Sequence, residues 1–260
     1  MSVMRREIRY RPLYEQVTRE LALRILSGDL RPNVGRNTEE ELCREFGVSR
    51  TVLREAIKVL AAKGLVEVRP KTGIRIKPRG EWALIDREVM GWQAEVGFSE
   101  DFLRNLFQVR LMLEPPTAAA AATNATDEDL EGIRDAFKRM ERGVPDFSVY
   151  VEGDCDFHDR ISRATHNGYL IQINSILLGA VRSAQSLFRT DRLDVIGSVS
   201  LHKDVCEAIL HHDPEWARSA MSRLIHHAER DTFLALKVEN QNQEQDAPGT
   251  ELARSLRTIG

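Results

Sequence analysis

The first third of the chain carries short amphipathic stretches separated by glycine- and proline-containing breaks. Apolar residues recur at helical spacing over residues 13–25, until the sequence SGDLRP interrupts them. The sequence TEEE at 38–41 has the pattern of a capping box and predicts a second helix, which ends at Gly47. Ser49 is a suitable N-cap for a third helix that runs to about Lys63. A glycine-marked turn between the second and third helices is typical of a helix-turn-helix.

The predicted third helix has one apolar and one cationic face. At about 100° per residue, Arg50, Thr51, Arg54 and Lys58 fall within one quadrant, and apolar residues occupy the opposite side. Residues 65–78 then alternate apolar and charged side chains around the turn PKTG, which predicts a small hairpin with a basic tip. A helix-turn-helix followed by such a hairpin is a winged helix, whose third helix enters the major groove of DNA. The expected partner of the cationic face is therefore DNA phosphate, with base edges within reach.

Beyond the hairpin the pattern is helical as far as residue 239. The sequence KPRGEW breaks regular structure, and a new periodic segment begins at Trp82. Helices are predicted over residues 82–96, 99–123, 127–142, 146–166, 168–190, 195–212 and 214–239. Pro115 and Pro116 fall inside the first long helix, where we expect a kink because proline lacks an amide hydrogen and clashes with the preceding turn.

These elements predict a mainly α protein with two domains of opposite charge. We expect a winged helix-turn-helix DNA-binding domain in residues 1–79, an all-helical effector-binding and dimerisation domain in 80–239, and a polar, disordered tail in 240–260. Residues 1–80 hold 18 lysines and arginines against 10 acidic residues, whereas the rest of the chain holds 19 against 30. A basic segment beside an acidic one favours a polyanionic partner for the first domain only.

Composition narrows the class of protein further. With 260 residues, of which 42% are hydrophobic and 30% charged, the chain is long enough to bury two cores. It has no apolar run of the roughly 18 residues needed to cross a bilayer and no secretory signal, so we expect a cytoplasmic protein without a membrane partner. The three cysteines, Cys43, Cys155 and Cys206, are odd in number and widely spaced, which predicts reduced thiols.

The first domain resembles a known family. The sequences LYEQVTRELALRILSGDLRP and ELCREFGVSRTVLREAIKVLAAKGLVEVRPKTG are similar to the DNA-binding domain of the GntR superfamily of bacterial transcription regulators. That resemblance implies operator contacts from Arg50, Thr51 and Arg54 on the recognition helix, and from Lys71, Thr72 and Gly73 on the wing. The family commonly has Leu-Pro-Ser-Glu before its second helix, where this chain has RNTE, so Arg36 is a further candidate for a phosphate contact. The alternative is that these cations are ordinary surface charges.

The helical remainder resembles the FCD ligand-binding domain of the FadR subfamily. The motifs are VRLMLEPPTAAAAA, DCDFHDRISRATHNGYL and LHKDVCEAILHHDPEWARSAM, and EWALIDREVMGWQ further resembles the sugar-acid (galactonate-type) regulators of that group. The resemblance implies a regulator that binds a palindromic double-stranded DNA operator as a homodimer and responds to a small organic acid. We expect a repressor that the acid releases from its operator.

Two side chains of the predicted bundle have the spacing of a metal site. Asp154 and His158 are four residues apart, so one turn of helix places a carboxylate oxygen and an imidazole nitrogen beside each other. His202 follows on a later helix with apolar periodicity and is expected to face the same bundle. A pair of this kind is also compatible with a simple Asp–His hydrogen bond or a capped core histidine.

The FCD resemblance strengthens the metal interpretation but leaves it incomplete. Many FCD domains bind a divalent metal through one aspartate and three histidines, and Asp154, His158 and His202 occupy three matching positions. The fourth position falls on Leu224, which cannot bind metal, and His227 three residues later is a substitute candidate. The site therefore holds a divalent metal such as zinc with His227, holds it with three protein ligands plus water or effector, or holds none.

Two further residues match effector positions of the family. The arginine of FCD domains that corresponds to Arg110 pairs with an effector carboxylate, a task that suits a guanidinium. The alternative is a surface pair with Glu114, four residues later. Asn167 matches a second pocket position, but it is equally compatible with a helix cap beside Gly168.

Two other classes of protein are compatible with parts of the sequence. A metal held by Asp154, His158 and His202 can activate water, which would make the protein a metal-dependent hydrolase. The chain has no HExxH sequence, no GxSxG elbow and no phosphate-binding glycine loop, and the basic winged helix would have no role in such an enzyme. An architectural DNA-binding protein would leave the acidic bundle without a purpose. We therefore predict an effector-responsive transcription regulator that is not an enzyme.

Overall fold

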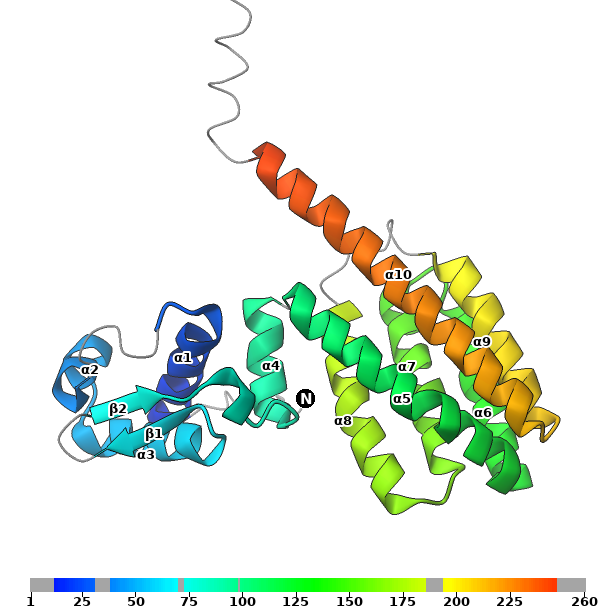
Figure 1. Cartoon of the computed structure of the whole chain (residues 1–260), viewed down its shortest axis with the longest axis horizontal. Coiled ribbons are helices and arrows are strands. Elements are labelled where there is room, and N and C mark those ends of the chain that lie inside the picture. The colour runs from blue at the N-terminus through cyan, green and yellow to red at the C-terminus, as the bar shows by residue number, and fades with distance from the viewer. Residues whose placement is uncertain (1–11, 31–37, 70–72, 98, 186–193, 247–260) are drawn as a thin grey trace, which may run out of the picture. The chain divides into compact units, whose positions relative to one another are not determined.

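The computed structural model divides the chain into two compact units, residues 1–97 and 98–260. The structure describes residues 12–30, 38–69, 73–97, 99–185 and 194–246. The first unit is a winged helix-turn-helix, and the second is a bundle of helices, so the predicted fold class is confirmed (Figure 1). Among the described residues, no helix combines the length and the apolar character needed to cross a membrane.

The first unit begins with three helices, α1 (Leu13–Ser27), α2 (Glu39–Phe46) and α3 (Arg50–Ala62). Their boundaries follow the caps that the sequence predicts. Thr38 forms the capping box with Glu41, and Gly47 ends α2 in the left-handed conformation that glycine adopts without strain. Ser49 then caps α3 by accepting a hydrogen bond from the backbone amide of Val52 at 3.4 Å.

The wing is an antiparallel pair of strands, β1 (Val66–Arg69) and β2 (Gly73–Ile76). Its register pairs Val66 with Ile76 and Val68 with Ile74, as the alternation of apolar and charged residues indicates. Val66 and Ile76 are buried against the helices. The core of this unit gathers apolar residues of the helices and the wing: Val17, Leu21, Ala22, Ile25, Leu42, Leu53, Ala56, Ile57, Leu60, Leu65, Val66, Ile76, Val89 and Trp92.

The predicted boundary at residue 80 differs from the structure, in which the first unit extends to Gly97. A short 3₁₀ helix, η1 (Arg79–Glu81), leads into α4 (Arg87–Val96), which packs against α1. Trp92 of α4 is buried in the core of the winged helix, and this burial holds α4 there. The interruption in KPRGEW marks a turn within the unit, and not a linker between domains.

The second unit contains the remaining six helices that the structure describes. They are α5 (Glu100–Asn124), α6 (Asp127–Arg142), α7 (Phe147–Arg163), α8 (Gly168–Gln185), α9 (Val195–Leu210) and α10 (Pro214–Asp246). Helix α5 packs against α7, α8, α9 and α10, so side chains on its buried face can contact residues of several helices (Figure 1). This helix continues through Pro115 and Pro116, where it carries two residues without backbone amide hydrogens.

The C-terminal tail begins later than predicted. Helix α10 continues to Asp246, so residues 240–246 are helical where we expected a disordered tail. Residues 247–260 lie outside the described part of the chain. Polar helices without apolar periodicity give little sequence signal, which explains the difference.

Candidate metal centre and nucleic-acid interface

The residues predicted to read DNA lie exposed at the start of α3. Arg50, Thr51 and Arg54 all occupy its solvent face, whereas Leu53 and Ile57 are buried in the core behind it. Helix-turn-helix proteins use the N-terminal residues of this helix for base contacts. The arrangement places two guanidinium groups where they can reach a major groove.

A carboxylate of α2 holds one of these guanidinium groups. The Nε atom of Arg54 donates to the two carboxylate oxygens of Glu39 at 3.2 and 3.1 Å. The side chain of Arg54 is still 62% exposed, so the pair is accessible to a phosphate or a base. Since an exposed ion pair contributes little to stability, exchanging Glu39 for DNA costs little.

The wing residues can be placed only in part. Gly73 opens β2 with a φ of 83°, a conformation that favours glycine, and its predicted DNA contact stays a prediction. Lys71 and Thr72 lie outside the described residues, and so does Arg36. Their predicted DNA contacts remain predictions.

In the bundle, two helices bring the predicted metal ligands together. Asp154 and His158 lie one turn apart on α7, and His202 lies on α9. One potential ligand atom of each residue lies within 4.8 Å of those of the others. All three residues are only 1–4% exposed, so the cluster is in the interior of the unit. Buried polar groups of this kind need partners or an ion.

The Nδ1 atom of each histidine contacts an oxygen atom outside the cluster of three. His158 Nδ1 lies 2.8 Å from Oε2 of Glu114, and His202 Nδ1 lies 2.8 Å from the carbonyl oxygen of Ser198. A carbonyl oxygen only accepts, so Nδ1 of His202 carries the hydrogen and donates it. Partners of this kind fix the tautomer of a metal-binding histidine and leave Nε2 as the ligand atom.

Both Nε2 atoms face the same carboxylate oxygen. Asp154 Oδ1 lies 2.8 Å from Nε2 of His202 and 3.9 Å from Nε2 of His158. Although His202 Nε2 is this close to the carboxylate, the two atoms lack the geometry of a hydrogen bond, and the nitrogen is fully buried. Two lone pairs at 2.8 Å repel unless a positive charge lies between them. That charge is either a proton on His202 or a bound cation.

An arginine–glutamate pair lies behind this cluster. Arg110 Nε donates to Oε1 of Glu114 at 2.6 Å, and its Nη2 donates to Oε2 at 3.4 Å. Both side chains are buried, so this is not the surface pair that was the alternative interpretation. Burial raises the pKa of Glu114, but the guanidinium of Arg110 and the imidazole of His158 outweigh it and lower the pKa to about 2.

The same balance holds the ligand carboxylate in its charged form. Burial raises the pKa of Asp154, but the adjacent imidazole of His202, with smaller contributions from His158 and Arg110, lowers it well below the usual range. Asp154 is therefore ionised at neutral pH, as a metal ligand must be.

The structure does not bring the other predicted ligands to the cluster. Leu224 is buried in the apolar core and offers no donor atom. His227 Nε2 lies 3.4 Å from the carbonyl oxygen of Asp194 and 3.8 Å from its carboxylate, and it is not part of the buried group of three. Asn167 is exposed, and its side-chain oxygen accepts from the amide of Tyr169 at 3.0 Å, which caps the start of α8 and not the end of a helix.

Sequence reasoning missed the second role of Glu114. It was predicted only as a possible partner of Arg110, yet it also contacts His158 on a different helix. The i, i+4 spacing signals the first contact, but the second depends on how α5 packs against α7. The Ser198 carbonyl that orients His202 has no side-chain signal at all, because it belongs to the backbone.

An exposed cationic recognition helix in a winged helix, joined to a separate bundle with a buried polar cluster, defines a DNA-binding transcription regulator. The chain belongs to the gntR family of bacterial regulatory proteins, whose model matches residues 13–76, and it carries an FCD domain over residues 105–227. Because this is a family of regulators, the hydrolase alternative is excluded.

Similar proteins agree with this assignment over most of the chain. The chain is 29% identical to the galactonate operon transcriptional repressor of Escherichia coli, over 81% of this chain and 93% of that one. It is 30% identical to YieP, an uncharacterized HTH-type transcriptional regulator of the same species, over 79% and 89%. A solved structure of Lar, which controls expression of the Listeria monocytogenes agr system, matches the fold with a TM-score of 0.60, 22% identity and coverage of 86% and 98%.

Proposed function

We propose that the protein is a cytoplasmic repressor that binds a palindromic operator as a homodimer and leaves it when the bundle binds a small hydroxy acid or sugar acid. The observation that carries the proposal is the pairing of an exposed cationic α3 with a buried Asp–His–His cluster in one chain. Its relatives include the galactonate operon repressor and the repressor NanR, which supports both repression and a sugar-acid effector.

DNA recognition is assigned to the exposed face of α3. Arg50 and Arg54 would read bases or phosphates, and Thr51 would add a hydroxyl contact, since guanidinium groups bind the edge of guanine with two hydrogen bonds. Lys71 and Thr72 of the wing, and Arg36, would contact the backbone. One winged helix reads too few base pairs for useful specificity, which favours a two-fold dimer.

The bundle offers an apolar surface for that dimer. Val109 and Met112 are exposed on α5, and Tyr169 and Ile173 are exposed on α8. The two helices pack against each other, and we propose that these side chains form one surface. Exposed apolar groups that gather in this way mark interaction sites, and a second copy of the chain is the proposed occupant.

A divalent metal such as zinc is proposed as the cation of the buried cluster. Asp154 would supply one oxygen, and His158 and His202 would supply their Nε2 atoms, which is a donor set that zinc accepts. When bound, the metal would act as a Lewis acid that attracts an anionic ligand. With three protein ligands and Leu224 in the fourth family position, the remaining coordination falls to water or the effector.

The effector is proposed to carry a carboxylate and an adjacent hydroxyl. Nε and Nη2 of Arg110 are used by Glu114, so an effector carboxylate would share the guanidinium through Nη1. The metal would provide the second positive anchor in an acidic domain. A hydroxy acid can use both anchors, whereas a neutral sugar cannot. The exposed Asn167, predicted as an effector contact, serves α8 as a cap and is not retained.

The experiment for the DNA assignment uses duplexes selected from a random library by the intact protein. Arg50→Ala and Arg54→Ala should each weaken binding to the selected site by about 1–3 kcal/mol, because each removes a base-reading group. Arg218→Ala is the matched control, since this exposed arginine lies on α10 of the bundle. Unchanged affinity in the Arg50/Arg54 double variant would contradict the assignment.

The experiment for the metal uses native mass spectrometry and competition with a zinc chelator. The wild type should carry up to one zinc ion per chain, and Asp154→Ala should lose it, because two ligands do not retain the ion. Leu224→His should increase zinc affinity by completing four protein ligands. His227→Ala is the control and should behave as the wild type. Equal zinc content in Asp154→Ala and the wild type would place the ion elsewhere.

A further inference from the structure

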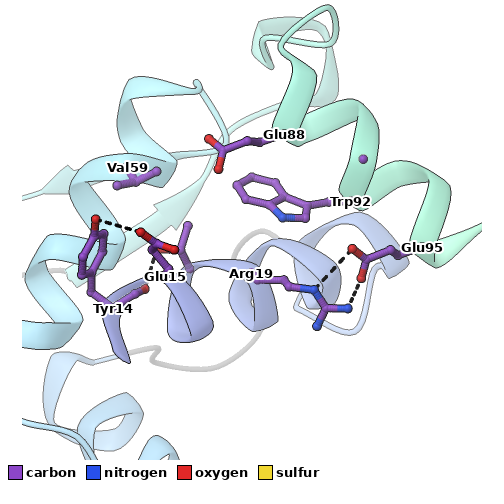
Figure 2. Close-up of a pocket in the computed structure, with 9 residues that line it drawn as sticks. Tyr14, Glu15, Arg19, Val59, Glu88, Trp92 and Glu95 are labelled. Atoms are coloured by element: carbon purple, nitrogen blue, oxygen red, sulfur yellow. Dashed lines mark hydrogen bonds and ion pairs between the residues drawn. The ribbon is translucent and has the colours of Figure 1, made fainter. Parts of the chain in front are cut away.

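A cavity of about 440 Å³ lies in the DNA-binding unit and is lined by residues of α1, α3 and α4. Figure 2 shows its walls: Tyr14, Glu15 and Arg19 come from α1, Val59 from α3, and Glu88 and Trp92 from α4. The volume is in the range of small-molecule sites. All these residues belong to the first unit, so the cavity is independent of the bundle and its cluster.

The walls carry more negative than positive charge. Arg19, the one cation among the lining residues, is held by both carboxylate oxygens of Glu95 at one end (Figure 2). Lys63 lies over the ring of Trp92, 5.8 Å from its centroid, and is shared between Glu88 at 2.7 Å and Asp86 at 2.8 Å. Arg19 and Lys63 therefore pair with the carboxylates of Glu95, Glu88 and Asp86. Glu15 adds a fourth negative charge.

Glu15 has no cationic partner among the described residues. Its contact at the cavity is the hydroxyl of Tyr14, which donates at 3.3 Å. The charge of Glu15, with smaller contributions from Glu55 and Glu88, raises the pKa of Tyr14, as expected at a site of negative potential. The side of the cavity near α1 thus presents an aromatic ring beside an uncompensated carboxylate.

A glycine keeps the cavity open. Gly91 lies in the interior of α4, where glycine costs helix stability relative to alanine. A Cβ atom built on Gly91 would meet no atom within 4 Å, so packing does not require a glycine there. Gly91 lines the cavity one residue before Trp92. Any longer side chain at this position would project into free space at the cavity.

We propose that this cavity binds a small organic cation, an ammonium or guanidinium group on a short apolar chain. The ring of Tyr14 would contact the cation, the part of Trp92 that lines the cavity would contact the apolar chain, and Glu15 would neutralise the charge. Val59 gives the chain an apolar contact on α3. Since the cavity joins α4 to the recognition helix, such a ligand would give the DNA-binding unit an input separate from the carboxylate effector of the bundle.

The test is a titration of the full-length, DNA-free protein followed by the indole ¹H–¹⁵N signal of Trp92, which Trp92→Phe assigns among the three tryptophans of the chain. Butylammonium and butylguanidinium should shift this signal, with a dissociation constant on the order of 1 mM for ligands of this size. Butanol and butanoate have similar size without the positive charge, and they should produce no saturable shift.

Three variants separate the cavity from a general charge effect. Glu15→Gln should weaken butylammonium binding by about threefold to tenfold, because it removes the uncompensated carboxylate. Gly91→Leu should abolish binding by filling the cavity, while circular dichroism shows an intact fold. Glu40→Gln removes an exposed charge on α2 and should bind as the wild type. The proposal is overturned if no probe shifts Trp92, if butanol binds as well as butylammonium, or if Gly91→Leu retains binding.

Discussion

Helix α5 carries two arginine–glutamate pairs with the same spacing and very different surroundings. Arg104 and Glu100 have side chains that are 54% and 60% exposed, whereas those of Arg110 and Glu114 are 5% and 3% exposed. Water screens the first pair, so its removal costs little. Removal of one partner from the second pair leaves a buried charge without compensation, which is strongly destabilising.

The two glutamates therefore make a matched comparison. Glu114→Gln should lower the free energy of unfolding at neutral pH by about 3 kcal/mol, and Glu100→Gln by less than about 1 kcal/mol. Urea denaturation of metal-free protein, followed by circular dichroism, measures both. Equal losses in the two variants would show that burial does not set the strength of the Arg110 pair.

The lowered pKa of Glu114 adds a pH dependence of known sign. Its pKa falls from 4.5 in the unfolded chain to about 2 in the folded protein. A carboxyl group whose folded pKa is lowered contributes stability that is complete above its unfolded pKa and is lost as the pH falls towards the folded one. The difference in unfolding free energy between wild type and Glu114→Gln should therefore shrink between about pH 5 and about pH 3. A difference that stays constant over this interval would contradict the assignment.

At the scale of elements, the end of the recognition helix depends on a close backbone approach. Gly64 follows α3 with a φ of 74°, and a Cβ atom there would lie 2.5 Å from the carbonyl oxygen of Glu81 in η1. Gly28 after α1 has a φ of 84°, but a Cβ atom would meet nothing within 4 Å. The two glycines share the left-handed backbone conformation, but only Gly64 has another backbone segment close to it.

Alanine at each position separates strain from steric contact. Gly28→Ala should cost about 1 kcal/mol from the left-handed conformation alone. Gly64→Ala should cost more, because η1 must also move, and it should weaken operator binding by disturbing the junction between α3 and the wing. Thermal unfolding and DNA titration of both variants test this. A Gly64→Ala protein no less stable than Gly28→Ala would contradict the role of the contact.

Most helices could be predicted from the periodicity of apolar residues, but the contacts between helices could not be predicted from that pattern. Apolar spacing predicts α6 at the residues that the structure has, 127–142, and the structure adds a capping box at Thr126 that fixes its start. Asp154 and His158 were paired because a single helix sets their distance. The approach of His202, the second contact of Glu114 and the exclusion of His227 depend on packing between helices, which spacing along one helix does not determine.

At the scale of the whole molecule, the proposed dimer surface can be tested without knowledge of the effector. Met112→Glu and Tyr169→Glu place charges among the exposed apolar side chains of α5 and α8, and should shift the protein towards the monomer in analytical ultracentrifugation. Operator affinity should fall with dimerisation, because the two half-sites would no longer be bound together.

Ile196→Glu is the control for this experiment. Ile196 is 78% exposed on α9, outside the proposed surface, so this variant should remain dimeric. A wild-type protein that sediments as a monomer, or an unchanged dimer in both Met112→Glu and Tyr169→Glu, would contradict the proposed surface.

The attachment of α4 to the winged helix determines where the chain can be divided to build chimeric sensors. Lys63 at the end of α3 pairs with Asp86, the N-cap of α4, and Trp92 completes the core. A fusion joined at residue 80 would remove that tryptophan from its core and leave Lys63 without its partners. A fusion joined after Gly97 would transfer an intact DNA-reading module, onto which the ligand domain of another regulator can be grafted.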